Sequence, residues 1–242
     1  MKMAELRAKK PIALANEKAT GGLRIFVNDV QIYVPGWVVN IDSFRRWVDS
    51  EEFPKTGNIW WLNGGVWADM SKEQAFSHLD VKGAIFAVLY FIVKQNKIGR
   101  IFTEGFLMTN HEADLSGNPD GLFLSRETIV SDRIRLITGA DGGVVEVQGS
   151  PDMVLEVVSD SSVKKDNVTL LRAYWTAGIT EYWLVDARND TLKFEILQHG
   201  PNGYKRTPKK HGWMTSKLFG KSFQLILEKD ASGYPEYSLE VR

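Results

Sequence analysis

Residues 151–187 read PDMVLEVVSDSSVKKDNVTLLRAYWTAGITEYWLVDA. The pattern predicts an apolar strand over 153–159, a polar turn at 160–162, a helix from about Val163 to Ala177, and a second apolar strand over 182–185. A strand, helix and strand of these lengths usually form two parallel neighbours joined by a right-handed crossover. The stretch therefore predicts an α/β fold with parallel strands at its centre.

Glu156 is the acidic residue in the first of these strands, where the surrounding sequence Val154–Val158 is otherwise apolar. A carboxylate is costly to bury unless another group pairs with it, and a metal ion or a lysine is the usual partner. Two interpretations follow. Glu156 forms a buried ion pair, for example with Lys165, or it binds a metal ion.

The chain has 242 residues, of which 43% are hydrophobic and 25% charged, with a formal net charge of zero. This balance is typical of a globular protein and gives no general argument for a nucleic-acid partner. The absence of cysteine excludes disulfides, thiolate zinc sites and cysteine nucleophiles. No acid lies between Glu195 and Glu228, but six basic residues do: Lys205, Arg206, Lys209, Lys210, Lys217 and Lys221. This basic segment is either a solvated hairpin face or an edge that contacts phosphate groups.

The N-terminal residues 1–22 are polar and end in two glycines, so we expect a flexible arm. No change in composition divides the rest of the chain, and residues 23–242 are expected to form one domain. The start of the chain has no apolar run like that of a signal peptide. The apolar stretch at 84–93 is flanked by charges and is too short to cross a bilayer. These features predict a cytoplasmic protein with no membrane partner.

Apolar spacing predicts a long helix over 72–95, with Ser71 as its N-cap. His78 and Lys82 lie four residues apart in this helix, so they share one face. The pair is either on the surface or directed at a site on the adjacent sheet.

Two further strands are predicted after this helix, at 100–108 and 121–124, and Asp120 lies where a loop enters the second. From residue 72 onward the order is therefore helix, strand, strand, strand, helix, strand. Shorter strands are predicted on either side of this core, at 23–27, 31–34, 223–227 and 237–241.

Asp120 and Glu156 are the two acids that this order places in central strands. If those strands pair, the carboxylates converge, and with the carbonyl oxygen of Val157 they offer the oxygen ligands that Mg²⁺ or Mn²⁺ prefers. Such an ion polarises a phosphoryl oxygen and lowers the pKa of a bound water. Lys164 and Lys165, at the start of the following helix, are placed to orient that water or to neutralise developing charge.

The order of elements resembles the restriction-endonuclease-like core of the PD-(D/E)XK superfamily. The local sequence motifs resemble one family more specifically, the Uma-type restriction endonuclease family. PDMVLEVVSDSS at 151–162, KKD and RAYWTAGITEYWLVDA resemble that family's second PD motif, basic turn and following helix. PDGLFLS at 119–125 resembles its first PD motif, and GGVWADMSKEQAFSHLDVKG at 64–83 resembles its entry hairpin and first helix. The likeness covers about residues 59–190 and implies this nuclease core with extra strands at both ends.

The resemblance implies that Asp120 and Glu156 are the metal-binding and catalytic acids, with Mg²⁺ or Mn²⁺ as the ion. Asp152, from the second PD, is implied as a supporting residue, since its spacing of four from Glu156 puts both on one face of the strand. His78 and Lys82 are also predicted to support the site.

The lysine of the family motif is not at either of its usual positions. Relatives place it two residues after the glutamate or four after the helix aspartate, and this chain has Val158 and Leu170 there. Lys164 or Lys165 is therefore predicted to take the catalytic lysine's role from the preceding turn.

Two functions stay open. The first is a metal-dependent endonuclease that hydrolyses phosphodiester bonds of DNA. The second, favoured by the displaced lysine and the zero net charge, is a catalytically inactive nuclease fold that binds nucleic acid or a protein partner. Metal binding distinguishes them, because an inactive module has no need of a cation at Asp120 and Glu156.

A duplex DNA substrate requires that the basic segment and the lysines at 164–165 lie on the same side as Asp120, since a protein of zero net charge must concentrate positive potential locally. Cutting both strands usually requires two active sites, so a homodimer is expected. The tryptophans of the N-terminal part are expected to cover the core rather than to stack on bases, and their layer is a candidate dimer interface; they are Trp37, Trp47, Trp60, Trp61 and Trp67.

Overall fold

The computed structural model describes residues 22–27, 30–189 and 191–242, so nearly all of the expected arm at 1–22 lies outside the described residues. The helices are α1 (Ile41–Val48), α2 (Val81–Asn96), α3 (Arg126–Val130) and α4 (Leu170–Thr176), and the π-helical turns η1 (Ala75–Asp80) and η2 (Lys165–Thr169) directly precede α2 and α4. The strands are β1 (Leu23–Val27), β2 (Val30–Val34), β3 (Asn58–Leu62), β4 (Gly65–Asp69), β5 (Gly99–Thr103), β6 (Leu107–Asn110), β7 (Leu115–Gly117), β8 (Gly121–Ser125), β9 (Ile134–Thr138), β10 (Val144–Gly149), β11 (Met153–Val157), β12 (Glu181–Asp186), β13 (Lys193–Gly200), β14 (Gly203–Arg206), β15 (Met214–Ser216), β16 (Lys221–Lys229) and β17 (Pro235–Val241).

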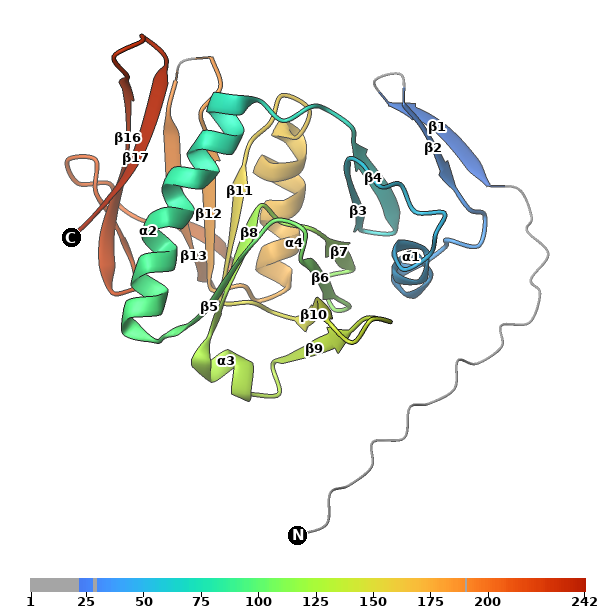
Figure 1. Cartoon of the computed structure of the whole chain (residues 1–242). Helices are drawn as coiled ribbons and strands as arrows, with labels where there is room; N and C mark the ends of the chain where they lie inside the picture. Colours follow the sequence, from blue (N-terminus) through green and yellow to red (C-terminus); the bar gives the residue numbers. More distant parts are fainter. Residues whose placement is uncertain (1–21, 28–29, 190) are drawn as a thin grey trace.

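One six-stranded sheet forms the centre of the fold, in the order β14-β13-β12-β11-β8-β5. β11 and β12 are parallel and are connected through η2 and α4, as the stretch 151–187 predicts. β8 is antiparallel to both of its neighbours, β11 and β5. The succession α2, β5, β8, β11, α4, β12 is the expected restriction-endonuclease-like core, and further strands precede and follow it (Figure 1). The predicted fold class is confirmed.

Apolar side chains cover both faces of this sheet, so β11 is buried along its whole length. On one face, Leu155 and Trp183 pack in a cluster with α2 and the β15-β16-β17 sheet. On the other face, Val154 and Leu184 pack with α4 and the second six-stranded sheet. A strand covered on both sides needs apolar residues at successive positions, which explains the unbroken run around Glu156.

The second large sheet has the order β4-β3-β7-β6-β10-β9 and is flanked by α1 and the β1-β2 hairpin (Figure 1). Trp47, Trp60 and Trp61 are 0%, 2% and 3% exposed in the clusters that these elements form. The expectation that the tryptophans cover the core is therefore confirmed for these three. Because they are buried within the subunit, they are not available as a dimer interface.

Two predicted elements differ from the structure. The expected helix over 72–95 begins later, with η1, because the side chain and backbone of Ser71 bond to Asp69 instead of capping a helix. The expected strand over 100–108 is divided into β5 and β6, because Gly105 takes a positive φ of 86° that turns the chain out of the sheet. The second half then joins the other sheet.

One helical segment, Ala75–Asn96, is long and apolar enough to span a bilayer by length and composition, among the residues described. Its apolar side chains at Val81, Ile85, Leu89 and Ile92 are nevertheless at most 3% exposed. They pack on the central sheet, as the core helix of a folded domain does.

Candidate active site

Strand pairing brings Asp120 beside Glu156. In the antiparallel pair of β8 and β11, Gly121 is opposite Leu155. Asp120, which precedes Gly121, is therefore adjacent to Glu156, which follows Leu155. Oδ2 of Asp120 accepts a hydrogen bond of 2.7 Å from the backbone N–H of Val157. The predicted pairing of the two central strands is confirmed, and it fixes the Asp120 carboxylate at the end of β11.

Glu156 is a buried carboxylate with little compensation. Its side chain is on the α4 side of the sheet, where the hydroxyl of Tyr174 donates a hydrogen bond of 2.5 Å to Oε1. The residue is 3% exposed. Burial raises the pKa of Glu156 well above its usual value, the positive charge of Lys165 opposes this, and the negative charge of Asp120 adds to it. A cation placed between the acids would remove this penalty.

Lys165 reaches the site from the first residue of η2. Its ammonium group lies 3.1 Å from Oδ1 of Asp166 and 4.7 Å from the ring centroid of Trp60, and the residue is 9% exposed. Burial alone would lower the pKa of Lys165, but the carboxylates of Glu156 and Asp166 outweigh it and raise this pKa. Lys165 is therefore a buried cation at the site.

Lys164 is exposed and does not line the pocket around these acids, so of the two predicted lysines only Lys165 is brought to Glu156 and Asp120. The positions where relatives carry the lysine are filled by apolar side chains. Val158 and Leu170 are 1% and 0% exposed and pack in the cluster around α4.

His78 is buried on η1, at 7% exposure, and faces the same acids. Its Nε2 lies 2.9 Å from the carbonyl oxygen of Val157 and 3.7 Å from Oδ2 of Asp120. Its Nδ1 lies 3.5 Å from Oε1 of Glu73 and has no hydrogen-bond partner among the described residues. Ligand atoms of Glu73, His78 and Asp120 lie within 4.8 Å of one another, which suits a shared cation.

Lys82 is also at the site rather than on the surface, at 6% exposure. Its ammonium group lies 2.9 Å from Oε1 of Glu73, 2.5 Å from Oε2 of Glu104 and 3.6 Å from Oδ1 of Asp120. Burial lowers the pKa of Lys82, and the charges of Asp120 and Glu104 raise it by more. Lys82 thus holds Asp120 from the side opposite to β11.

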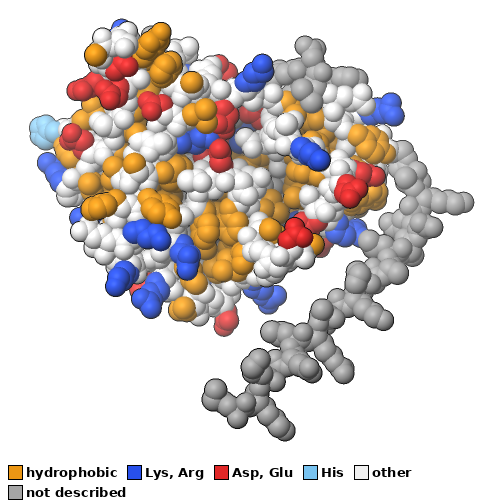
Figure 2. Space-filling model, viewed as in Figure 1, with side chains coloured by type: hydrophobic (Ala, Val, Ile, Leu, Met, Phe, Trp, Pro, Cys, Tyr) orange, Lys and Arg blue, Asp and Glu red, His pale blue; other side chains and the backbone are white. Residues whose placement is uncertain are grey.

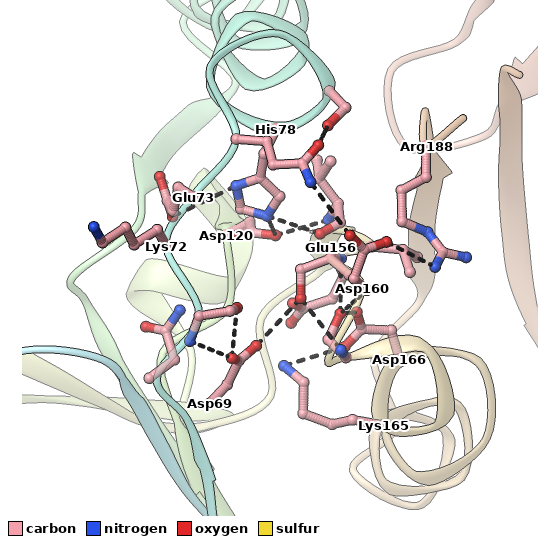
Figure 3. A pocket seen from close by; sticks show the side chains of 18 of the residues that line it. Asp69, Lys72, Glu73, His78, Asp120, Glu156, Asp160, Lys165, Asp166 and Arg188 are labelled. Atoms are coloured by element: carbon pink, nitrogen blue, oxygen red, sulfur yellow. Dashed lines mark hydrogen bonds and ion pairs between the residues drawn. The ribbon is translucent and has the colours of Figure 1, made fainter. Parts of the chain in front are cut away.

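Glu73, His78, Asp120, Glu156, Lys165 and Asp166, but not Lys82 or Tyr174, are among the residues that line one pocket of about 70 Å³, enough for a metal ion with a few water molecules (Figure 3). Figure 3 shows the ring of His78 between Glu73 and Asp120, with Lys165 and Asp166 approaching from η2. Of the described residues, six acidic and three basic ones line the pocket: Asp69, Glu73, Asp120, Glu156, Asp160 and Asp166 against Lys72, Lys165 and Arg188. The excess of acids would repel a phosphate group unless cations were bound.

Asp152 has a different position from the one expected of a supporting residue. Its Oδ2 accepts from the backbone N–H of Ser125 and its Oδ1 from the hydroxyl of Thr128, at 2.6 and 2.8 Å. It precedes β11, at the end far from the site, and it does not line the pocket. Alternation puts Asp152 and Glu156 on one face, but the length of the strand separates them, and Asp152 fixes the start of α3.

The basic segment lies away from the site, contrary to the expectation for duplex DNA. Lys205 and Arg206 are on β14, at the far edge of the central sheet. The backbone N–H of Lys217 donates to Oε1 of Glu181, which begins β12, whereas Glu156 pairs with Leu184 further along that strand. The segment therefore follows the opposite edge and the opposite end of the sheet.

Glu73, Asp166 and Tyr174 were not predicted as site residues. Glu73 lies in the irregular stretch before η1, where sequence spacing predicts a helix. Its contact with His78 could therefore not be predicted from the sequence. Tyr174 lies eight residues after Asp166, which is about two turns of a regular helix. Helical spacing could therefore have placed both side chains on the helix face that meets β11.

The fold and the site together define a restriction-endonuclease-like protein with a buried acidic site. A family profile named Uma2, described as "Putative restriction endonuclease", matches residues 41–228. The chain belongs to this family, which supports a nuclease-like function and the use of a divalent metal ion.

A solved structure from Anabaena variabilis, described as a "putative nuclease belonging to DUF820", is similar to this chain in fold. The TM-score is 0.55 at 16% sequence identity, and the match covers 75% of this chain and 91% of that chain. A search of curated proteins found no match to the chain.

Proposed function

We propose that this protein is a metal-dependent endonuclease that hydrolyses phosphodiester bonds of DNA. The observation that carries the proposal is the excess of acids at the pocket. Glu156 and Asp120 are 3% and 8% exposed, and among the described residues six acids line the pocket against three basic residues, with Lys82 behind Asp120 as a fourth cation. Buried carboxylates in such excess are costly, and a divalent cation is the group that offsets the cost. The family supports this class of chemistry.

The residues present fit such an ion. Asp120, Glu156 and the carbonyl oxygen of Val157 supply oxygen ligands, and His78, whose buried ring lies between Asp120 and Glu73, adds an imidazole nitrogen. Oxygen ligands suit Mg²⁺ and Mn²⁺, and an imidazole shifts the preference toward Mn²⁺. When bound, the ion would polarise a phosphoryl oxygen and lower the pKa of a water.

The other residues prepare the site for that chemistry. Tyr174 holds Oε1 of Glu156, and the Val157 N–H holds Oδ2 of Asp120, so both carboxylates are fixed before a substrate arrives. The ammonium group of Lys165 is buried beside them and stays protonated, so it can stabilise negative charge that develops on the phosphoryl group. Lys82 orients Asp120 from the other side.

The alternative is a catalytically inactive module that binds nucleic acid or a protein partner. The apolar side chains of Val158 and Leu170, where relatives carry the lysine, favour it. The presence of Lys165 at the same acids is the argument against it.

The test is titration with Mn²⁺ and Mg²⁺ by calorimetry on the wild type and on Asp120→Ala and Glu156→Ala, followed by cleavage assays on labelled DNA with the same proteins. We expect binding to the wild type and its loss in both variants, together with loss of cleavage. Glu181→Gln is the control, since Glu181 is a buried glutamate of the next strand outside the pocket. Metal binding without cleavage of any DNA would favour the inactive module, and no metal binding to the wild type would refute the proposal.

The homodimer was expected from cleavage of both strands of a duplex, and with the basic segment away from the site that argument loses its support. Dimerisation stays a prediction, which sedimentation velocity tests directly.

A further inference from the structure

We infer that single-stranded nucleic acid binds in a basic groove along the open edge of β5 and reaches the acidic pocket from there. The inference rests on the proposed function and adds the substrate class and its path. The groove, here called the β5 groove, has a volume of about 560 Å³, and its lining includes Tyr90, Lys94, Lys97, Arg100, Phe102 and Arg126.

The charge of the β5 groove is of one sign. Lys94, Lys97, Arg100 and Arg126 line it, and among the residues that the structure describes no aspartate or glutamate does. All four side chains are exposed, and none forms an ion pair within the described part of the chain. Four unpaired cations around one concavity attract a polyanion and repel a second copy of the same surface. In Figure 2, Lys and Arg side chains gather over the lower part of α2, beside an apolar patch.

The groove also offers surfaces on which bases stack. Tyr90 is 48% exposed, and the ammonium group of Lys94 lies 5.5 Å from the centre of its ring. Phe102 lines the groove nearer to the site and is itself stacked on Phe106 at 4.6 Å. An aromatic ring beside a cation is the arrangement that binds single strands without sequence preference.

The groove leads to the site because β5 and β8 run side by side. Phe102 pairs with Leu122 and Thr103 with Gly121, so the end of β5 reaches the residue after Asp120. At about 3.3 Å per residue, the path along β5 from Gly99 to Thr103 is roughly 13 Å long. Because β5 is the last strand of the sheet, no further strand among the described residues covers this path.

The depth of the pocket favours a single strand over a duplex. Asp120 and Glu156 are 8% and 3% exposed behind η1 and η2. A rigid duplex presents its phosphates on a convex surface, whereas a flexible strand can bend one phosphate into a recess. The predicted basic segment on β14 cannot assist either substrate, because three strands separate it from β8.

The test measures binding of a fluorescein-labelled oligothymidine and of a labelled duplex by fluorescence anisotropy, in EDTA so that no cleavage occurs. The groove variant is Arg100→Glu on β5 with Arg126→Glu on α3. The control is Lys205→Glu with Arg206→Glu on β14, which reverses two exposed charges on the opposite edge of the sheet, one of them, Arg206, paired with Glu195. We expect the groove variant to bind the oligothymidine at least about tenfold more weakly. We also expect the slope of log K against log salt to fall by about 1.4, from two lost phosphate contacts. The control should bind like the wild type.

The alternative role of the groove cations is to keep the open edge of β5 from pairing with another strand. The glutamates of the groove variant would serve that role equally well, because any charged side chain protects a sheet edge. If the cations serve only that purpose, the groove variant will bind the oligothymidine like the wild type, which would overturn the inference. Equal weakening in the β14 control, or tighter binding of the duplex than of the single strand, would also overturn it. So would loss of self-association in the groove variant with unchanged oligonucleotide binding, since the groove would then hold a second copy.

Calorimetry with Mn²⁺ on the same proteins separates this inference from the proposed function. The groove variant should bind Mn²⁺ like the wild type, because Arg100 and Arg126 are outside the pocket. If the wild type binds the oligothymidine through the groove but binds no metal, the proposed function fails, while the binding of single strands in the groove stands.

Discussion

Glu156→Gln should make the metal-free protein more stable, not less. The carboxylate is 3% exposed, and the hydroxyl of Tyr174 is its hydrogen-bond donor among the described residues. Burial raises its pKa above the usual 4.5, and each unit of such a rise corresponds to about 1.4 kcal/mol of destabilisation of the charged form. A neutral amide removes this cost but leaves Lys165 with less negative charge beside it. We expect a net gain of about 1–2 kcal/mol at pH 8, as is common when a functional group is removed.

The gain should depend on pH with a defined sign. Because the folded-state pKa of Glu156 is raised, the wild type keeps the stabilising contribution of its protonated form below about pH 4.5. It loses that contribution as the pH rises through the raised pKa. The advantage of Glu156→Gln is therefore near zero at about pH 4.5 and largest at alkaline pH.

The assay is thermal and urea denaturation in EDTA between about pH 5 and pH 8, repeated with Mn²⁺. A gain of about 1–2 kcal/mol raises the Tm by roughly 2–8 °C for a chain of this size. Mn²⁺ at about 100 times its Kd should stabilise the wild type by about 2.7 kcal/mol and leave Glu156→Gln unchanged.

Glu181→Gln is the matched control, because Glu181 is 0% exposed but accepts hydrogen bonds from Trp183 Nε1, Ser216 Oγ and the Lys217 N–H. Replacing a carboxylate that accepts hydrogen bonds from these donors should destabilise the protein by about 1–3 kcal/mol. If Glu156→Gln in EDTA at pH 8 is destabilised like this control, Glu156 belongs to a satisfied structural network and the reasoning is refuted.

Three more predictions concern neighbouring residues. Lys165→Met should lower DNA cleavage by about 100-fold or more while Mn²⁺ still binds, whereas the exposed Lys164→Met should cleave normally; equal rates in both would remove Lys165 from the mechanism. His78→Ala should weaken Mn²⁺ binding by about tenfold or more and Mg²⁺ binding by less, as calorimetry can measure, and an equal loss for both ions would show that the imidazole is not a ligand. Asp152→Asn should cost about 1.5–3 kcal/mol in urea denaturation with metal affinity unchanged, and weaker metal binding would place Asp152 in the site after all.

The sequence by itself determined the core of the fold. The apolar run of β11, the following helix and the apolar run of β12 are local patterns, and a short crossover between two strands leaves one common arrangement. Asp120 and Glu156 could be predicted for the same reason. Each interrupts or borders an apolar strand, and strands that are neighbours in the core bring such residues together.

Lys165, His78 and Lys82 could be named from the sequence as candidates for the site, but only the tertiary structure decided that they contact these acids and that Glu73 joins them. Glu73 and His78 reach the site through an irregular stretch and a π-helical turn, which sequence spacing reads as a regular helix. Lys165 depends on a second such turn, and π-helical turns are not marked by residue type.

The distribution of basic residues over the surface of the folded protein could likewise not be predicted from the sequence. The cluster at 205–221 is continuous in the chain, yet it follows the far edge of the sheet. The β5 groove instead gathers Lys94, Lys97, Arg100 and Arg126 from three elements, none of which is conspicuous by itself. Local patterns set which strands and helices form, because they depend on neighbours along the chain. The electrostatic surface depends on which elements pack side by side, and only the folded chain determines that.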